Sequence, residues 1–399
     1  MKLAYLKNLL KQNSEQEGKC QLMKVREESK EIFGCPSLEC WPTNDHFRET
    51  SPSLKVILVV GGSGFLGRHI ICNLIHSFRD LREIRILDRS IIGAFEQVEA
   101  VIHCASVISI SSSHSYEDTY LTNVVGVRNV IQAMQMKNVN YIIYTSSAIC
   151  SRKYGPMVME DENSTSFKEN STFENHVFPL YSRTKIEAEN SILSRLDGNN
   201  KLKAIILRPP GIYGEGDFIY LSTMILTALK NFGALVRVGW GSKPMISRIY
   251  AGNCAWAHVC ALKALINEKR ILSGKIFLID DESSRCTNDE FVEPYLRANN
   301  CYVSRICIPY FLIYFFLTFV QIILRLISPI VKMKTSVETS QLYLHCSSMV
   351  YKCDQARKFI GYKPRFNMEN SELRSMSFYR RLKENLDYYE KSRMMAKFK

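Results

Sequence analysis

Three glycines, Gly61, Gly64 and Gly67, lie in the segment VVGGSGFLGRHI between an apolar run and a stretch with helical periodicity. The preceding run, LKVILVV, is rich in β-branched residues and has no polar alternation, which is typical of a strand buried on both faces. Glycine in such a turn lets the backbone approach a pyrophosphate, and the positive end of the following helix binds its charge. The segment therefore predicts the strand, turn and helix of a dinucleotide site.

Similar apolar strands alternate with helices further along the chain. The predicted strands lie in EIRILD, AVIHCAS, NYIIYTSS, KLKAIILRPP and SGKIFLIDD. This alternation predicts an α/β fold, a Rossmann-like doubly wound parallel sheet with helices on both faces. After Gly211 the rhythm loosens, and a smaller substrate lobe is expected there. The domain prediction is a loose extension at 1–53, the NAD-binding domain with the catalytic residues at 54–210, the substrate lobe mainly at 211–305, an apolar membrane-associated segment at 306–330 and a basic C-terminal region at 331–399.

Asp88 ends the second predicted strand, twenty-one residues past Gly67. A carboxylate there accepts hydrogen bonds from the adenosine ribose hydroxyls and repels a 2′-phosphate, so NAD is favoured over NADP. Arg89 beside it would tolerate the phosphate.

A YxxxK sequence, Tyr181 to Lys185, places two side chains one turn apart on a helix face. A lysine ammonium favours the phenolate, so the tyrosine could exchange a proton with a substrate alcohol. The segment YTSS ends a predicted strand thirty-four residues upstream, at the sheet edge where ligands bind. Ser147 there can hold the substrate oxygen, and Ser146 is the neighbour that could be confused with it.

These features, in this order, resemble the extended short-chain dehydrogenase/reductase superfamily. RPPGIYGEGD at 208–217, IYAGNCAWAHVCALKAL at 249–265 and the late apolar segment are similar to the 3β-hydroxysteroid dehydrogenase/Δ5-Δ4 isomerase family. The resemblance covers about residues 54–390 and implies Tyr181 as the proton-transferring residue, Lys185 as its electrostatic partner and Ser147 as the substrate-oxygen donor. It also implies cofactor contacts at Gly61, Gly64, Phe65, Leu66, Gly67, Asp88, Ala105, Tyr181 and Lys185.

The same resemblance implies a sterol pocket lined by Tyr213 and residues of the 220s to 240s. The competing interpretation makes IYG a packing turn and places Trp240 and Trp256 in the core. NVVG at 123–126 is similar to the family's structural asparagine motif.

The sequence departs from the family after the second strand. Only twelve residues, 88–99, separate that strand from the next, where the family has a helix, a third strand and another helix. Twelve residues can form one short crossover. We therefore expect the third, edge strand to be missing and the strand at 84–87 to become an exposed edge. Natural loss and a shortened transcript would both produce this gap.

Charge and hydropathy patterns point to a membrane. Nineteen uncharged residues lie between Arg305 and Arg325, about the length that a bilayer needs. Pro309 and Gln321 interrupt the run, so we expect this segment to attach the protein to a membrane without necessarily crossing the bilayer. The alternative is a hydrophobic helix buried in the protein. Residues 331–399 carry fifteen Lys or Arg and seven Asp or Glu, which after an apolar segment favours an anionic membrane face over nucleic acid.

The number and spacing of the cysteines indicate the cellular compartment of the protein. Thirteen cysteines are scattered without a CxxC pair or metal spacing, which predicts reduced thiols facing the cytosol and no metal site. The expected location is the endoplasmic reticulum membrane, with a mitochondrial membrane as the alternative, and a homodimer stays open.

The leading functional hypothesis is NAD-dependent oxidation of the 3β-hydroxyl of a steroid or sterol to the 3-ketone, with Δ5-Δ4 isomerisation as an open addition. The second is a sterol 4-carboxylate 3-dehydrogenase, or a reductase or epimerase of a nucleotide sugar or phenolic ketone. The third is a catalytically impaired membrane protein that binds a sterol or partner.

Overall fold

A seven-stranded sheet forms the centre of the molecule. The computed structural model describes residues 21–24, 51–87, 92–109, 115–154, 175–196, 201–239, 244–267, 272–281, 283, 286–327 and 339–384. The strand order is β1-β3-β2-β4-β5-β6-β10, parallel except for β1. The strands are β1 (Gln21–Lys24), β2 (Val56–Val60), β3 (Glu83–Leu87), β4 (Ala100–His103), β5 (Tyr141–Thr145), β6 (Lys203–Arg208) and β10 (Lys275–Leu278). The predicted doubly wound α/β sheet is confirmed, with all six strands in place.

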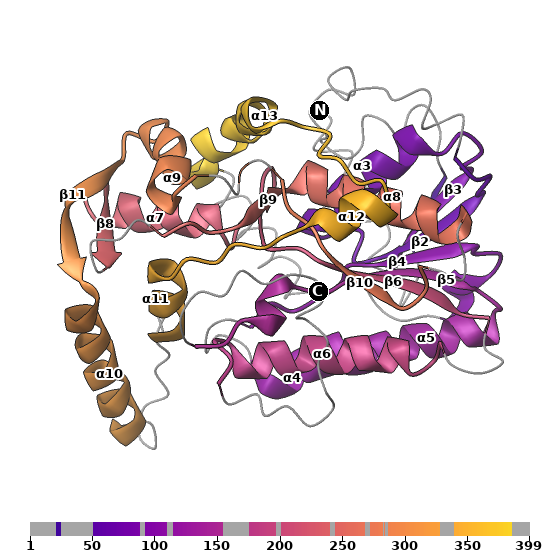
Figure 1. Cartoon of the computed structure of the whole chain (residues 1–399), viewed down its shortest axis with the longest axis horizontal. Helices are drawn as coiled ribbons and strands as arrows, with labels where there is room; N and C mark the ends of the chain where they lie inside the picture. The colour runs from indigo at the N-terminus through magenta and orange to yellow at the C-terminus, as the bar shows by residue number, and fades with distance from the viewer. Residues whose placement is uncertain are drawn as a thin grey trace.

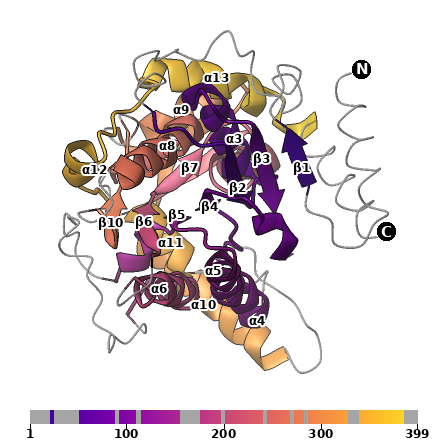
Figure 2. The ribbon, with the colours of Figure 1, turned by 90° about the vertical axis from the view of Figure 1, so that its right-hand side faces the viewer.

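Helices cover both faces of this sheet (Figures 1 and 2). Along β2, Ile57 and Val59 join the core under α3 (Phe65–Ser77) and α8 (Ala251–Asn267), whereas Val56 and Leu58 join the core on the opposite face. This division explains why the strand sequence shows no polar alternation. The second face carries α5 (Gly126–Met136) and α6 (Pro179–Leu193), preceded by α4 (Tyr116–Tyr120) and the π-helix η4 (Leu121–Val125).

The edge beside β3 differs from the expectation. Between β3 and β4 the described chain forms only the short 3-10 helix η3 (Ile92–Phe95), so no third parallel strand follows β3 there. The edge that we expected to be exposed is paired instead: β1, from the extension that we expected to be loose, runs antiparallel to β3 with Gln21 opposite Ile86. Backbone groups of β3 left without a partner are the physical reason for this addition.

A second lobe packs at the carboxyl ends of the strands. It contains β7 (Gly211–Tyr213) paired with β9 (Arg248–Tyr250), and β8 (Ala234–Gly239) paired with β11 (Tyr302–Pro309). Its helices are α7 (Leu221–Lys230), α9 (Asn288–Arg297) and, from the C-terminal region, α13 (Met368–Arg380). Together they share one hydrophobic core. Two further segments of the C-terminal region, α11 (Thr339–Cys346) and α12 (Asp354–Phe359), pack beside β8 and β10.

The apolar segment forms α10 (Tyr310–Ile327), which projects from β11 away from the sheet (Figure 1). Many of its large apolar side chains are exposed, among them Phe315, Phe316 and Phe319. Within the described part of the chain, no helix combines the length and the apolar character needed to cross a membrane.

The cysteines depart from expectation at one position. Nine of the described cysteines are free thiols, as predicted, whereas Cys72 in α3 is disulfide-bonded.

Candidate active site

The turn between β2 and α3 is closely packed around its glycines. Gly61 has a φ of +85°, and a Cβ there would lie 2.6 Å from the nitrogen of Ala105. A Cβ on Gly67 would lie 2.1 Å from the carbonyl oxygen of Gly61. Gly64 is the N-cap of α3 and no side chain caps its first N–H groups. A cradle of bare backbone with a helix N-terminus facing it fits a dinucleotide pyrophosphate. The predicted Phe65 and Leu66 form the first turn of this helix.

The segment after β4 completes the floor of the cradle. Ala105 donates its N–H to the oxygen of Val60 (3.0 Å) and touches Gly61. Buried Asn123 holds the next residues, because its side chain accepts from the Val107 N–H (2.8 Å) and donates to the Val107 oxygen (2.9 Å). Asn123 also donates to the Thr184 hydroxyl (3.2 Å), which ties the cradle floor to α6. The asparagine thus fixes the distance between the cofactor turn and the YxxxK helix.

Tyr181 lies at the carboxyl edge of the sheet, as the sequence predicted. Burial raises the pKa of Tyr181, and the hydroxyls of the nearby Ser147 and Ser106 oppose this rise. Ser147 precedes the 3-10 helix η5 (Ala148–Ser151), whereas Ser146 is buried with its hydroxyl 3.9 Å from the Cys150 sulfur. The structure therefore brings Ser147, and not Ser146, to the tyrosine. Ser106 was not predicted, and its position directly after Ala105 was the available signal.

Lys185 is buried below Tyr181 on α6. Its ammonium donates to the carbonyl oxygen of Thr145 (3.0 Å) and lies 5.2 Å from the centre of the Tyr144 ring. Burial lowers the pKa of Lys185 to about 8, against the opposite effects of Cys150 and Glu189. Among the described contacts, its ammonium meets the end of β5 and not the Tyr181 hydroxyl. Its role as electrostatic partner and ribose contact stays a prediction.

Two buried polar pairs fix the elements around this tyrosine and lysine. Glu189, one turn beyond Lys185, receives two hydrogen bonds from the Arg208 guanidinium (2.8 and 2.5 Å), so α6 is tied to the end of β6. On the opposite face of the sheet, His258 of α8 donates from Nδ1 to the carbonyl oxygen of Cys254 (2.8 Å). Its Nε2 accepts a hydrogen bond from the Thr145 hydroxyl (2.7 Å). Burial lowers the pKa of His258 to about 4, which keeps this acceptor neutral. Neither His258 nor Glu189 was predicted from the sequence.

An apolar wall surrounds Tyr181. Val177 and Phe178 lie beside it, and Ile149, Tyr343 and Leu344 pack against these three residues. Tyr343 and Leu344 belong to α11, which in turn contacts α10. The reacting edge is therefore bounded by apolar side chains from two distant parts of the chain.

Other predicted residues lie elsewhere. Asp88, Arg89 and Trp240 fall outside the described residues, so the NAD preference argued from Asp88 stays a prediction. Tyr213 is buried in the core of the second lobe with its ring against Phe291, and Trp256, a residue of α8, belongs to the core between that helix and the sheet. For these two residues the packing interpretation holds.

The model of the 3-beta hydroxysteroid dehydrogenase/isomerase family matches residues 58–92 and 89–309, more than half of the 399 residues. The chain belongs to the 3-beta hydroxysteroid dehydrogenase/isomerase family. The two matched segments overlap at residues 89–92, in the interval of the sequence where the third strand was expected to be missing.

Curated relatives and solved structures extend the comparison. The 3 beta-hydroxysteroid dehydrogenase type 7 of Mus musculus is 26% identical over 365 residues, covering 81% of this chain and 95% of the relative. The decarboxylating sterol-4-alpha-carboxylate 3-dehydrogenase of Mus musculus is 24% identical over 366 residues, covering 86% and 96%. The dTDP-glucose 4,6-dehydratase DesIV of Streptomyces venezuelae, solved with NAD and TYD bound, has a TM-score of 0.57 at 15% identity, covering 82% of this chain and 97% of that chain. The last likeness shows the shared fold.

Proposed function

We propose that this member of the 3-beta hydroxysteroid dehydrogenase/isomerase family oxidises the 3β-hydroxyl of a steroid or sterol to the 3-ketone with NAD. The observation that carries the proposal is the buried Tyr181, which lies near Ser147 and Ser106 and packs against an apolar wall. Ser147 holds the substrate oxygen, and Tyr181, as the phenolate that the nearby Lys185 ammonium favours, accepts the hydroxyl proton as the C–H bond at C3 breaks. The turn of Gly61, Gly64 and Gly67 would hold NAD, which would supply the hydride acceptor. The apolar wall supplies affinity for the sterol rings and excludes water. Δ5-Δ4 isomerisation would need a further base, to which we assign no residue.

The direct test is a substrate panel with the full-length protein and NAD. Neutral 3β-hydroxysterols, 3β-hydroxysterols with a C4 carboxylate, and nucleotide sugars are compared by the rate of NADH formation. Oxidation of a sterol supports the proposal. Conversion of a nucleotide sugar alone would overturn it.

A second candidate, oxidation of a 3β-hydroxysterol that carries a C4 carboxylate, is favoured by Arg152. This guanidinium is buried, and in the described part of the chain no carboxylate contacts it and its Nε has no hydrogen-bond partner. It lies 5.7 Å from the centre of the Tyr343 ring and donates to that hydroxyl (3.3 Å), at the wall of the Tyr181 site. Burying an arginine without an anionic partner costs folding free energy. A substrate carboxylate next to the 3-hydroxyl would offset this cost by pairing with the guanidinium.

Replacing Arg152 by Met separates the two candidates. If the guanidinium binds a carboxylate, kcat/KM for the 4-carboxysterol falls about 100-fold, the size of a lost charge-assisted hydrogen bond, and kcat/KM for neutral sterols stays within about twofold. An equal loss for both substrates would assign Arg152 a structural role and remove support for the second candidate.

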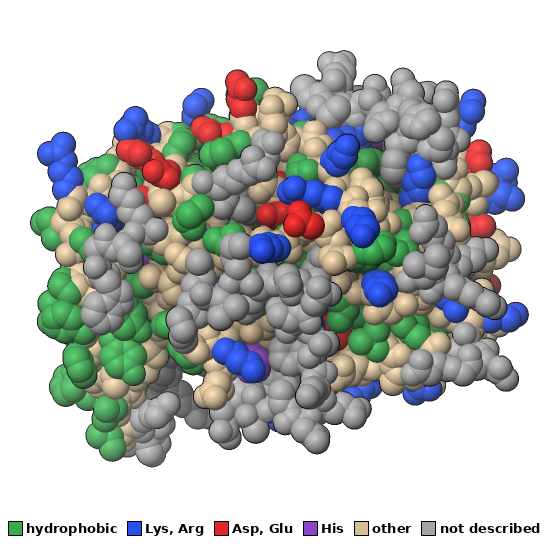
Figure 3. Space-filling model, in the orientation of Figure 1, with side chains coloured by type: hydrophobic (Ala, Val, Ile, Leu, Met, Phe, Trp, Pro, Cys, Tyr) green, Lys and Arg blue, Asp and Glu red, His purple; other side chains and the backbone are tan. Residues whose placement is uncertain are grey.

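We also propose that α10 attaches the protein to a membrane surface, at the endoplasmic reticulum or at a mitochondrial membrane, with the catalytic domain facing the cytosol. Support comes from its exposed apolar side chains, which gather at the lower left of Figure 3. The strongly exposed large ones are Phe311, Leu312, Phe315, Phe316, Phe319, Ile322 and Leu326. A contiguous apolar face of this kind is typical of an interfacial helix.

Vesicle flotation tests this attachment. The wild type is expected to float with phosphatidylcholine/phosphatidylserine vesicles, and a variant with serine at positions 315, 316 and 319 should bind at least about tenfold more weakly because three phenylalanines no longer enter the interface. Phe232, a fully exposed phenylalanine outside α10, provides the matched control Phe232→Ser. Equal flotation of all three proteins would contradict the proposal.

A further inference from the structure

The helix α13 lies against the loop of residues 214–217, far from the cofactor motif in sequence. Tyr379 of α13 is fully buried, and its hydroxyl accepts the Gly214 N–H (2.9 Å) and donates to the Asp217 carboxylate (2.9 Å). Asp217 itself accepts the N–H groups at the start of α7. One side chain of the C-terminal helix thus holds both ends of the 214–217 loop.

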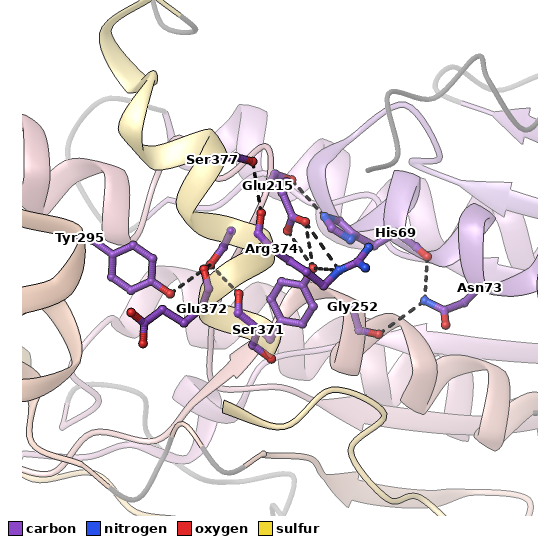
Figure 4. A network of polar contacts seen from close by, with 11 residues as sticks. His69, Asn73, Glu215, Gly252, Tyr295, Ser371, Glu372, Arg374 and Ser377 are labelled. Atoms are coloured by element: carbon purple, nitrogen blue, oxygen red, sulfur yellow. Dashed lines mark hydrogen bonds and ion pairs between the residues drawn. The ribbon is translucent and has the colours of Figure 1, made fainter. Parts of the chain in front are cut away.

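Arg374, one and a half turns earlier on α13, reaches the middle of the same loop (Figure 4). Its Nε donates to the Tyr250 hydroxyl (3.2 Å), which in turn donates to the Glu215 carboxylate at 2.9 Å. The guanidinium lies 4.0 Å from that carboxylate, and the two side chains are only 8% and 16% exposed, so solvent screens their attraction little. The central carbon of the Arg374 guanidinium lies 4.8 Å from the centre of the Phe366 ring, so the ring packs against the guanidinium.

The other side of the 214–217 loop rests on the first turns of α3. The carbonyl oxygen of Glu215 accepts a hydrogen bond from Nε2 of His69 (3.0 Å). A Cβ on Gly216 would lie 3.4 Å from the Phe65 ring, so the loop backbone is in contact with this residue. Phe65 and His69 also pack edge to face, 5.6 Å apart. The loop therefore touches the helix turn whose free N–H groups face the cofactor cradle.

From these contacts we infer that α13, through Arg374 and Tyr379, positions the N-terminus of α3 for binding the cofactor pyrophosphate. Anion binding at a helix N-terminus depends on the orientation of a few N–H groups, and residues that fix this orientation set the affinity without touching the ligand. Arg374 and Tyr379 are positioning residues in this sense. The inference rests on the NAD-binding part of the proposed function and is independent of the identity of the sterol.

The test measures NADH affinity of the full-length protein by fluorescence titration. Arg374→Met is expected to weaken NADH binding about tenfold, as the loss of one charge-assisted contact predicts. KM for NAD should rise by the same factor, while kcat at saturating NAD and KM for the sterol stay within about twofold, a split that general destabilisation would not produce. Arg380→Met, the same substitution at an exposed position of α13, is the matched control and should leave NADH affinity unchanged.

Two milder variants keep the inference testable if Arg374→Met folds poorly. Tyr379→Phe removes the two hydrogen bonds to the 214–217 loop, and Glu215→Gln removes the charge that faces Arg374 while keeping an acceptor for Tyr250; each should weaken NADH binding about threefold or more. Wild-type affinity in all folded variants would overturn the inference. Absence of saturable NADH binding by the wild type would instead overturn the proposed cofactor, so the two failures are distinguishable.

Discussion

Tyr181→Phe should lower kcat for sterol oxidation by about a thousandfold, within the range for loss of a general acid–base. The phenyl ring keeps its packing against Val177 and Phe178, and only the hydroxyl that meets Ser147 and Ser106 disappears. NADH affinity and the melting temperature should therefore stay close to the wild type. The measurement is initial-rate kinetics beside an NADH fluorescence titration.

The matched control is Tyr141→Phe, which removes a hydroxyl at the opposite end of β5. It should leave kcat within about twofold, because it lies away from the edge where substrate binds. Full activity of Tyr181→Phe would exclude the proton transfer proposed for this residue. Equal losses in both variants would point to a general effect of removing tyrosine hydroxyls.

The second large effect is expected from Gly61→Ala. The added Cβ would lie 2.6 Å from the backbone of Ala105, and the residue would have to keep a φ of +85°. Either Ala105 or the turn must move, and both form the cradle. We expect at least about a hundredfold loss of NADH affinity, because several pyrophosphate contacts change together.

A substitution at Gly361 distinguishes the two effects expected at Gly61, which are the steric clash of the added Cβ and the backbone strain of a positive φ. Gly361 also has a positive φ, +64°, but nothing lies within 4 Å of the Cβ that alanine would add. Gly361→Ala should cost about 1 kcal/mol of unfolding free energy through backbone strain and leave NADH affinity unchanged. If Gly61→Ala bound NADH as tightly as Gly361→Ala, the cradle would not be the cofactor site.

Local patterns predicted most of the sheet and the centre of the site. The parallel strands could be found because each is apolar on both faces, and Tyr181, Ser147 and Gly61 because strand ends and glycine turns have local signatures. His258 and Arg152 carry no such signature. Each acquires its place through a contact with a residue distant in sequence, such as Thr145 for His258 and Tyr343 for Arg152.

The role of the C-terminal region was also hidden from the sequence. Residues 331–399 were predicted to be a basic region, yet α13 within them contacts the loop of residues 214–217. Arg374 and Tyr379 read as an ordinary charged and aromatic residue of an amphipathic helix. Only the fold shows that they face Glu215 and Asp217.

The antiparallel strand at the sheet edge has a consequence for how this architecture tolerates the loss of a whole strand-and-helix unit. An edge position requires a row of backbone donors and acceptors, and a strand of either direction can provide it. A segment from before the first strand can therefore occupy the vacant position without any change in the order of the remaining strands. An outer position of a doubly wound sheet can thus be filled by another segment of the chain more readily than a central one, where a strand must pair on both sides.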